Sequence, residues 1–579
     1  MNTLFKHTHL HGEVGPSPFG RLMALLRPEK SDIWSVVLYS IGVGALTLAV
    51  PVAVQLLVNT VAFGSLLQPL IVLTALLFFG LTISAALRAM QTYVLEIIQR
   101  RIFVRVVSRL AHRLPRVRVD VFDRTHGPEL VNRFFDVLTV QKVGAQLLLD
   151  GLAILLQGTI GMLVLAFYHP ILLAFDVVLL ILLLIIIFVM GRRAIATSID
   201  ESYAKYQVAG WLEEMARHPL AFKLGGGPQY ALERADLLAR EYLTNRSRHF
   251  SILFRQTVGA LALQAVASTA LLGIGGWLVI EGRMTLGQLV AAELIVTLVV
   301  ASFAKLGKHL ESFYDLMAAV EKLGQLLDLP AERQGGDART RAKGPARLLV
   351  DSLTFAYEGS PPAIRDFTLR IEPGERVGIV GPNGSGKSTL VELLFAMRTP
   401  TGGRIELDGV DLRDLRLDEL RRTVAIVQGF EMFEGTILDN VRLGRDEITH
   451  ERIREALAAV DLLDEVLRMP DALNTVLTTG GAPLSSGQAR RLQIARAIVG
   501  EPALLVIDES LEDIEVRPRR KVLETLLDRS APWTLLVASH GDDVLARMDR
   551  VVRMTRADEE SDADDNRNPV DGKERRSHA

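Results

Sequence analysis

The residues best suited to chemistry lie at positions 381–388, in the stretch GPNGSGKS. Its glycines let backbone N–H groups curl around a polyphosphate without clashes from Cβ atoms. Lys387 is placed to reach the outer phosphates, and the Ser388 hydroxyl is a ligand for Mg²⁺. The stretch matches G-x-x-x-x-G-K-[ST] and lies between an expected strand, RVGIV, and an expected helix. This context predicts a nucleotide-binding P-loop.

A second candidate is ALLVIDES at positions 503–510, an apolar strand pattern that ends in two acids. Asp508 is suited to hold Mg²⁺, and Glu509 is suited to polarise an attacking water. An apolar strand ending in Asp-Glu is weak evidence by itself. Because it follows a P-loop in the same half of the chain, it predicts hydrolysis of a nucleoside triphosphate.

A third candidate is PLSSGQARRLQIARA at positions 483–497, which reads as a phosphate site with a part missing. A short Ser/Gly loop runs directly into a helical pattern. The start of a helix offers free N–H groups and the positive end of the helix dipole to an anion. The loop contains no lysine to hold the phosphate. An ordinary N-cap before an amphipathic helix is the alternative interpretation.

The elements that position these motifs belong to an α/β domain, because short β-rich runs alternate with helices from position 349 onward. A polar, glycine-containing stretch precedes it and is typical of a linker. The expected organisation is a leader and surface helix at 1–32, a transmembrane domain at 33–328, a linker at 329–348, an ATP-binding domain at 349–556 and a disordered charged tail at 557–579.

The first half of the chain is expected to lie in a membrane. The chain has 579 residues, of which 49% are hydrophobic, and long apolar runs recur up to about residue 310. Each run has about the 20 residues that a bilayer needs. The sequence therefore predicts an all-α membrane domain of six spanning helices, near 33–57, 66–89, 146–168, 170–191, 257–280 and 285–307.

The orientation follows from the basic residues. Arginine is dense at 100–118 after the second span, and GRRAIATSIDESYAKYQ follows the fourth, whereas the other connections are short and nearly uncharged. The positive-inside rule therefore places both termini, both long loops and the ATPase domain in the cytoplasm. The long loops keep a helical pattern, so we expect the helices to continue beyond the membrane. FGRLMALLRPEK, before the first span, is typical of an amphipathic surface helix.

Two acids, Asp176 and Glu293, fall inside predicted spans at a similar depth, roughly 10–12 Å from the outer end at 1.5 Å per residue. Carboxylates at that depth are costly unless they face a partner or water. One interpretation is structural: a hydrogen bond, or pairing with a helix face that avoids lipid. The other is an acidic ring in a transport cavity that favours cationic cargo.

Composition excludes several classes of site. The chain has no cysteine, which excludes disulfides, cysteine-ligated zinc, iron–sulphur clusters and a cysteine nucleophile. The formal net charge is −2, and we expect no nucleic-acid partner. The first residues lack the apolar core of a signal peptide. His7, His9 and His11 alternate there and could bind a metal, although a mobile leader is the simpler interpretation.

The order of these motifs carries a resemblance. P-loop, VAIVQGFEMFEGTILDNV, PLSSGQ, LLVIDE and VASH follow one another as in the ATPase domain of ABC transporters. Joined to six N-terminal spans, the chain resembles a half-size ABC exporter over nearly its whole length. RTHGPELVNRFFDV is similar to the first intracellular loop of that family, and GRMTLGQLVAAELIV to the start of its sixth span.

The resemblance implies that the third candidate is the ABC signature, which faces a γ-phosphate held by the P-loop of another subunit. Ser485, Gly487 and Gln488 then complete a site that one chain cannot close. The chain has one P-loop and one signature. A second copy of the chain, or a related half-transporter, is therefore the expected partner.

Other roles carry over by position. Tyr357 resembles the aromatic residue that stacks on adenine, with a strand-core tyrosine as the alternative. Gln428 resembles the residue that touches Mg²⁺ and the membrane-domain helices, and His540 the switch histidine at the γ-phosphate. The implied ATP-binding set is Tyr357, Gly381, Pro382, Asn383, Gly384, Ser385, Gly386, Lys387, Ser388, Thr389, Ser485, Gly487 and Gln488; the Mg²⁺ set is Ser388, Gln428 and Asp508; the catalytic set is Glu509, His540, Lys387 and Gln428.

Three positions depart from the family pattern. Ser486 stands where the signature usually has Gly, and Thr479 stands about where a Glu is common. After Glu509 the family usually reads A-T-S-A-L-D, whereas this chain reads S-L-E-D-I-E at 510–515. The change adds carboxylates near the expected dimer seam, where like charges repel. The main hydrolytic residues are intact, so we still expect an active ATPase.

The sequence thus predicts a homodimeric, ATP-driven exporter in a bacterial inner membrane, with peptides, lipids or hydrophobic small molecules as cargo. ATP binding is expected to close the two ATPase domains, and the loop ends at 124–136 and 210–226 to transmit closure to the spans. One alternative is a heterodimer with a related half-transporter. Another is a membrane-bound regulatory ATPase that moves no cargo.

Overall fold

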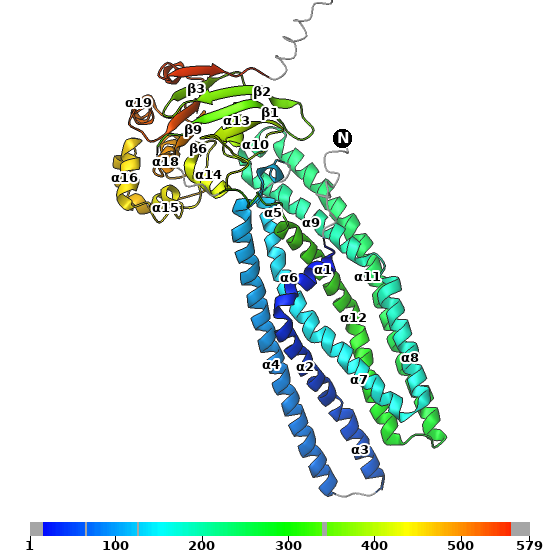
Figure 1. Cartoon of the computed structure of the whole chain (residues 1–579). Helices are drawn as coiled ribbons and strands as arrows, with labels where there is room; N and C mark the ends of the chain where they lie inside the picture. The colour runs from blue at the N-terminus through cyan, green and yellow to red at the C-terminus, as the bar shows by residue number, and fades with distance from the viewer. Residues whose placement is uncertain (1–15, 64–66, 124–126, 338–343, 557–579) are drawn as a thin grey trace, which may run out of the picture. The chain divides into compact units, whose positions relative to one another are not determined.

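The computed structural model describes residues 16–63, 67–123, 127–337 and 344–556 (Figure 1). The chain divides into two compact units. The first comprises Met1–Val117 and Val121–Pro330, and the second comprises Arg118–Asp120 and Ala331–Ala579. The histidines at positions 7, 9 and 11 and the acidic tail lie outside the described residues.

The first unit is built from long helices (Figure 1). The longest, α11 (Gly227–Ile280), has 54 residues and is about 80 Å long at 1.5 Å per residue, far more than the ~30 Å hydrocarbon core. The expectation that helices continue beyond the membrane is confirmed. The other helices of this unit are α1 (Pro18–Leu26), α2 (Lys30–Thr47), α3 (Ala49–Phe63), α4 (Leu67–Arg113), α5 (Gly127–Asn132), α6 (Asp136–Gln146), α7 (Leu152–Tyr168), α8 (Pro170–Leu184), α9 (Ala194–Arg217), α10 (Pro219–Lys223) and α12 (Leu286–Leu327).

Within the described residues, five helices are long and apolar enough to cross a membrane. A sixth apolar segment, Leu286–Val299, begins α12. The five are Pro18–Thr60, Leu70–Arg116, Leu130–Tyr168, Pro170–Met190 and Gly227–Ile280. These segments correspond in order to the six predicted spans. The apolar window of the second is only 6% buried, so its surface is free to meet lipid or another chain.

Small residues let the membrane helices approach closely. A Cβ at Gly161 of α7 would lie 3.0 Å from the Ile295 side chain of α12, and one at Gly275 of α11 would lie 2.6 Å from Leu289. Asp176 of α8 is 4% exposed, and neither of its oxygens has a hydrogen-bond partner among the described residues. The described residues thus give Asp176 no hydrogen bond, and both interpretations of this acid stay predictions.

A polar cluster is buried where α6, α9 and α12 pack together. Lys322 of α12, beyond the apolar segment of that helix, is fully buried. Its ammonium group lies 3.7 Å from the ring centroid of Tyr206 and donates to the hydroxyl of Ser202. Burial lowers the pKa of Lys322 to about 6, against the opposing charge of Asp136.

The second unit contains two larger sheets. Five parallel strands run in the order β11-β3-β10-β9-β6, and four antiparallel strands in the order β2-β1-β4-β5. The strands are β1 (Leu348–Ala356), β2 (Pro362–Ile371), β3 (Arg376–Val380), β4 (Gly402–Leu407), β5 (Val410–Asp411), β6 (Val424–Val427), β7 (Gly435–Thr436), β8 (Val476–Leu477), β9 (Leu504–Asp508), β10 (Thr534–Ala538) and β11 (Arg550–Arg553).

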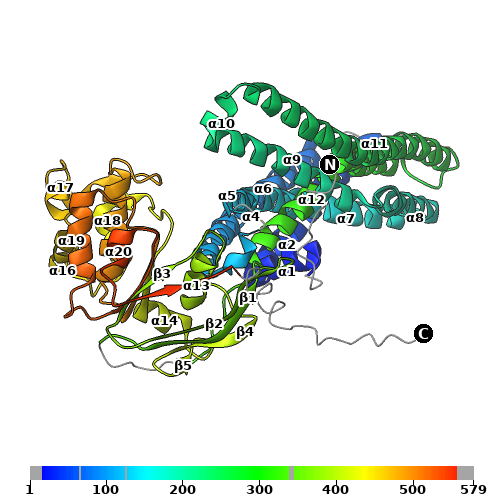
Figure 2. The ribbon, with the colours of Figure 1, turned by 90° about the horizontal axis from the view of Figure 1, so that it is seen from above.

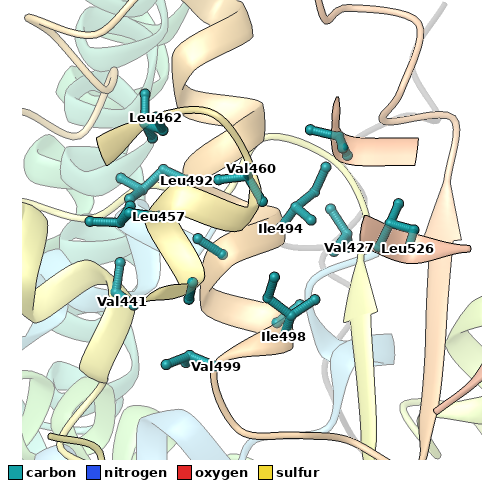
Figure 3. Packing of buried hydrophobic residues seen from close by; sticks show 14 of the residues in the cluster. Val427, Val441, Leu457, Val460, Leu462, Leu492, Ile494, Ile498, Val499 and Leu526 are labelled. Carbon is teal, nitrogen blue, oxygen red and sulfur yellow. The ribbon is translucent and has the colours of Figure 1, made fainter. Parts of the chain in front are cut away.

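The central strands β9 and β10 are buried at every position, which explains their unbroken apolar sequences. The helices of this unit gather partly in a separate group around α18 (Figure 2). They share a core of aliphatic side chains, which includes Val441, Leu457, Leu492 and Ile498 (Figure 3). The helices are α13 (Lys387–Leu394), α14 (Leu417–Thr423), α15 (Ile437–Arg442), α16 (His450–Ala459), α17 (Leu463–Leu467), α18 (Ser486–Ile498), α19 (Val516–Leu526) and α20 (Asp542–Leu545).

Candidate functional site

Four neighbouring strands deliver the predicted hydrolytic residues to one edge of the parallel sheet. The P-loop follows β3, His540 follows β10, Asp508 ends β9, and Gln428 follows β6. These strands are adjacent in the order β3-β10-β9-β6. The carboxyl ends of parallel strands meet at the same edge, which is where such sheets bind ligands. Segments far apart in the sequence therefore converge there.

The P-loop conformation requires its glycines. Gly384 and Gly386 have φ angles of 86° and 90°, in the region that favours glycine. A Cβ at Gly381 would lie 2.4 Å from the Met554 carbonyl oxygen, and one at Gly386 would lie 2.7 Å from that of Ala363. The loop ends at the start of α13, so its backbone and the helix N-terminus face the same space.

Lys387 is the cation of this loop, and its side chain is nearly buried. Its Nζ atom donates to the Gly381 carbonyl at 2.9 Å and lies 3.4 Å from Oε1 of Glu509. A buried ammonium group held this way within a Gly-rich loop fits a polyphosphate, which would supply the opposite charge.

Asp508 provides the second charged group. It is 7% exposed, and burial raises the pKa of its carboxyl, opposed by a hydrogen bond with Ser388. Among the described residues, Oδ1 of Asp508 and Oγ of Ser385 are buried without hydrogen-bond partners. Buried polar atoms are normally paired, so these orphaned oxygens fit a bound nucleotide and a Mg²⁺ ion, which prefers oxygen ligands.

Glu509 has a strained backbone, with a φ angle of 46°. Its N–H donates to the Ala538 carbonyl at 2.9 Å, which ties the end of β9 to β10. Non-glycine residues in this conformation are uncommon and cluster at functional sites. The carboxylate is 45% exposed, and Nε2 of His540 lies 3.1 Å from its Oε1 atom. The two predicted catalytic side chains therefore touch.

Gln428 and Tyr357 lie at the margins of this group. Val427 pairs with Ile507, so Gln428 follows in register beside Asp508. The Tyr357 hydroxyl is 3.0 Å from Oγ1 of Thr389, at the end of the P-loop. The tyrosine ring also lies 4.7 Å from the Arg398 guanidinium. Its position beside the loop is compatible with adenine stacking, which stays a prediction.

The predicted signature forms a firmly capped helix start. The Ser485 hydroxyl accepts from the Gln488 N–H at 3.3 Å, and the Gln488 side chain accepts from the Ser485 N–H at 2.7 Å. Gln488 also donates to Glu465 at 2.6 Å, and Glu465 receives two further hydrogen bonds from Arg491. Sequence reasoning missed Glu465, because nothing local links it to a loop so much later in the chain.

The signature and the P-loop begin different helices of the second unit. No hydrogen bond or ion pair in the described part of the chain joins Ser485, Gly487 or Gln488 to residues 381–389. The signature begins α18 in the helical group, whereas the P-loop begins α13 against the sheet (Figure 2). The helix start at Ser485 thus has a side open to another molecule.

Comparison with known proteins settles the family. The model of the ABC transporter transmembrane region matches residues 33–303, and the ABC transporter model matches residues 364–512. An "ATP-dependent lipid A-core flippase" of Ralstonia nicotianae is 30% identical over 555 residues, which cover 93% of this chain and 92% of the relative. The chain belongs to the ABC transporter family. The prediction of an ATPase coupled to transport is therefore confirmed.

Other relatives of this ABC transporter agree. A flippase of the same description from Cupriavidus pinatubonensis is 29% identical, with 92% of this chain and 91% of the relative covered. The "ABC multidrug transporter mdr2" of Aspergillus fumigatus is 27% identical over 93% of this chain and 70% of its own. A bacterial Atm1-family ABC exporter with ATP bound shares the fold, with a TM-score of 0.81, 20% identity and coverage of 92% and 95%. The predicted half-size exporter fold is confirmed.

Proposed function

We propose that this ABC transporter is a homodimer that exports a lipid-like amphiphile, and that each of its two ATP sites combines the P-loop of one copy with the signature of the other. One observation carries the proposal: Ser485 and Lys387 lie at the starts of different helices, and among the described residues no hydrogen bond or ion pair joins the two loops within one chain. ATP would act as the molecule that joins the copies.

The residues divide the work of hydrolysis. Lys387 and the loop N–H groups would bind the phosphates, and Tyr357 would meet the adenine. Ser388, Gln428 and Asp508 would hold Mg²⁺, which when bound offsets phosphate charge. Glu509 would orient a water and accept its proton, while His540 holds the carboxylate in position.

The cargo proposal rests on a cavity in the membrane unit. It has a volume of about 410 Å³ and mainly apolar walls, formed by Thr47, Val50, Pro51, Leu81, Ser84, Ala85, Arg88, Leu294, Thr297 and Leu298. Among the described residues, Arg88 is the one charged residue in these walls. An apolar cavity with one cation suits an amphiphile with an anionic head group. The names of the lipid A-core flippases point to the same chemical class.

The acidic cavity expected from Asp176 and Glu293 gains no support from this arrangement, because neither residue lines the cavity. The basic stretch at 100–118 favours a cytoplasmic ATPase domain, and the bacterial flippase relatives favour the inner membrane. The cytoplasmic ATPase domain and the inner-membrane location are part of the proposal.

Mixing two inactive variants tests the shared site. Lys387→Ala disables the P-loop, and Ser486→Arg places a bulky cation on the exposed face of the signature helix. Each variant alone should lose ATPase activity. A mixed dimer keeps one site with an intact P-loop and an intact signature, so up to half of the activity per mixed dimer should return. Complementation that fails although the mixed dimer forms would exclude the shared site.

Transport itself needs a separate measurement. The purified chain should run as a dimer without any other polypeptide, and in vesicles it should move a fluorescent anionic lipid between leaflets only with ATP. A requirement for a second, different chain would support the heterodimer. ATPase activity without movement of any lipid, peptide or hydrophobic dye would support the regulatory ATPase.

A further inference from the structure

The turn after Glu509 contains the largest departure from the family pattern, and its first acid has specific partners. Oε1 of Glu512 accepts a hydrogen bond from the Ser539 hydroxyl and lies 3.3 Å from the backbone N–H of His540. Ser539 is fully buried, so this contact is shielded from water on the serine side. A single carboxylate oxygen thus holds the segment that carries the switch histidine.

The same segment is organised further by its own serine. The Gly541 N–H donates to the Ser539 hydroxyl at 2.9 Å, which shapes the backbone on both sides of His540. The ring of His540 meets Glu509, from the same loop as Glu512. Glu512 therefore fixes the backbone of His540, while Glu509 meets its ring. Between the two acids, Ser510 and Leu511 are buried and anchor the loop.

The second acid of the turn is also paired within the chain. Oδ2 of Asp513 lies 3.0 Å from Nε of Arg490 on the signature helix. Arg490 also donates to the carbonyl of Gly429, the residue after Gln428. A Cβ at Gly487 would lie 3.3 Å from the Asp513 carbonyl oxygen, so the turn and the start of α18 are closely packed. The turn is therefore anchored at its far end.

We propose that Glu512 is a positioning residue of the ATPase: its carboxylate oxygen holds Ser539 and the His540 backbone so that the His540 ring stays on Glu509. The inference rests on the proposed roles of Glu509 and His540. It also reinterprets the acidic turn. Two carboxylates of this turn, those of Glu512 and Asp513, already have partners inside one subunit. The main effect of Glu512 is therefore to hold the His540 segment in place, and not to repel a second subunit.

The test compares three variants of the full chain in lipid nanodiscs. Glu512→Ala removes both accepted hydrogen bonds and should lower kcat about tenfold, with KM for MgATP unchanged within about twofold. Glu512→Gln keeps an oxygen that can accept both bonds and should retain most of the activity. Glu524→Gln removes the same charge from an exposed helix position and is the matched control. Its kinetics should equal those of the wild type.

Several results would overturn the proposal. Higher turnover in both Glu512 variants would show that charge repulsion dominates, and an unchanged kcat in Glu512→Ala would show that the contact does nothing. If Glu512→Ala does not fold, Ser539→Ala should show the same fall in kcat at constant KM, and its failure to do so would count against the proposal.

A Glu509→Gln variant distinguishes this inference from the function on which it rests. If Glu509→Gln is inactive while Glu512→Ala turns over normally, only the positioning role is wrong. If Glu509→Gln turns over at the wild-type rate, the assigned hydrolytic site itself is wrong.

Discussion

His540 and Glu509 are in contact: Nε2 of the imidazole lies 3.1 Å from Oε1 of the carboxylate. The Nζ atom of Lys387 lies 3.4 Å from the same oxygen. One carboxylate oxygen therefore faces both the P-loop lysine and the histidine after the neighbouring strand. A water bound beside Glu509 would lie next to Lys387 and His540, the two residues proposed to meet the γ-phosphate.

This contact predicts that Glu509→Gln loses ATP hydrolysis but keeps ATP binding. The amide cannot accept a proton from water, whereas the P-loop that binds ATP is unchanged. Turnover should fall at least about 100-fold, and binding of a fluorescent ATP analogue should be retained. Glu455→Gln, an exposed change on α16, is the control and should hydrolyse ATP normally. Wild-type turnover in Glu509→Gln would remove Glu509 from its assigned role.

Glu465 is predicted to support the signature. Burial alone would raise the pKa of Glu465, but hydrogen bonds from Arg491 and Gln488 lower it. Glu465→Ala leaves the nearly buried Arg491 without its carboxylate and frees the Gln488 side chain. Only the Arg491 side of this pair is buried, and a buried cation left without its carboxylate is destabilising.

We therefore expect Glu465→Ala to lower the melting temperature by several degrees and to reduce ATPase activity more than ATP binding. ATP binding should be less affected because the P-loop of each copy is intact. Asp464→Asn, the exposed neighbouring position, is the matched control. Equal melting temperatures and ATPase rates in the two variants would contradict the supporting role of Glu465.

The sequence could predict the P-loop, Asp508 and Glu509 because each lies in a short pattern whose flanking strand and helix are also local. The spans were predictable because a bilayer imposes its thickness on apolar runs. Glu465 and Glu512 act on residues 23 and 27 positions away, and only the packed fold brings those pairs together. The π-helical turns Leu147–Gly151 and Ile185–Met190 likewise left no clear sequence signal, whereas the α2–α3 break at Leu48 lies just before Pro51, which cannot donate to the preceding turn.

Buried Lys322 predicts a dependence of stability on pH. Its pKa is lowered from the usual 10.5 of a lysine side chain to about 6 in the folded chain, because burial disfavours the charge. Between these two pKa values the unfolded chain binds one more proton than the folded chain. The destabilisation of the fold by Lys322 is therefore complete below about pH 6 and becomes smaller as the pH rises. The wild type should therefore gain stability with rising pH across this window.

Lys322→Met keeps the length of the side chain and removes the titrating group. The melting temperature of Lys322→Met should exceed that of the wild type most near pH 6, and the difference should become smaller toward pH 9. The lost contacts to Ser202 and Tyr206 shift this difference by a constant amount, so the slope with pH is the decisive quantity. Parallel curves for the two proteins would show that Lys322 stays charged in the fold.

Arg88 predicts the charge of the cargo. It lines the apolar cavity, and within the described residues its guanidinium group makes no hydrogen bond or ion pair. Arg88→Gln should raise the concentration of an anionic lipid that half-maximally stimulates ATPase by about tenfold, as expected for a loss of roughly 1.4 kcal/mol. Arg88→Lys should lose less because it keeps the charge. Arg109→Gln, an exposed change farther along α4, is the control.

The same assay decides between this cavity and the acidic alternative. One outcome is that anionic lipids stimulate the ATPase activity, and that this stimulation is weakened by Arg88→Gln but not by Asp176→Asn or Glu293→Gln. In that case the cation in the cavity selects the cargo. If cationic amphiphiles stimulate instead, and loss of either acid abolishes their effect, the acids select it and the Arg88 proposal is wrong. The two outcomes differ in the sign of the cargo charge, so one panel of matched lipids separates them.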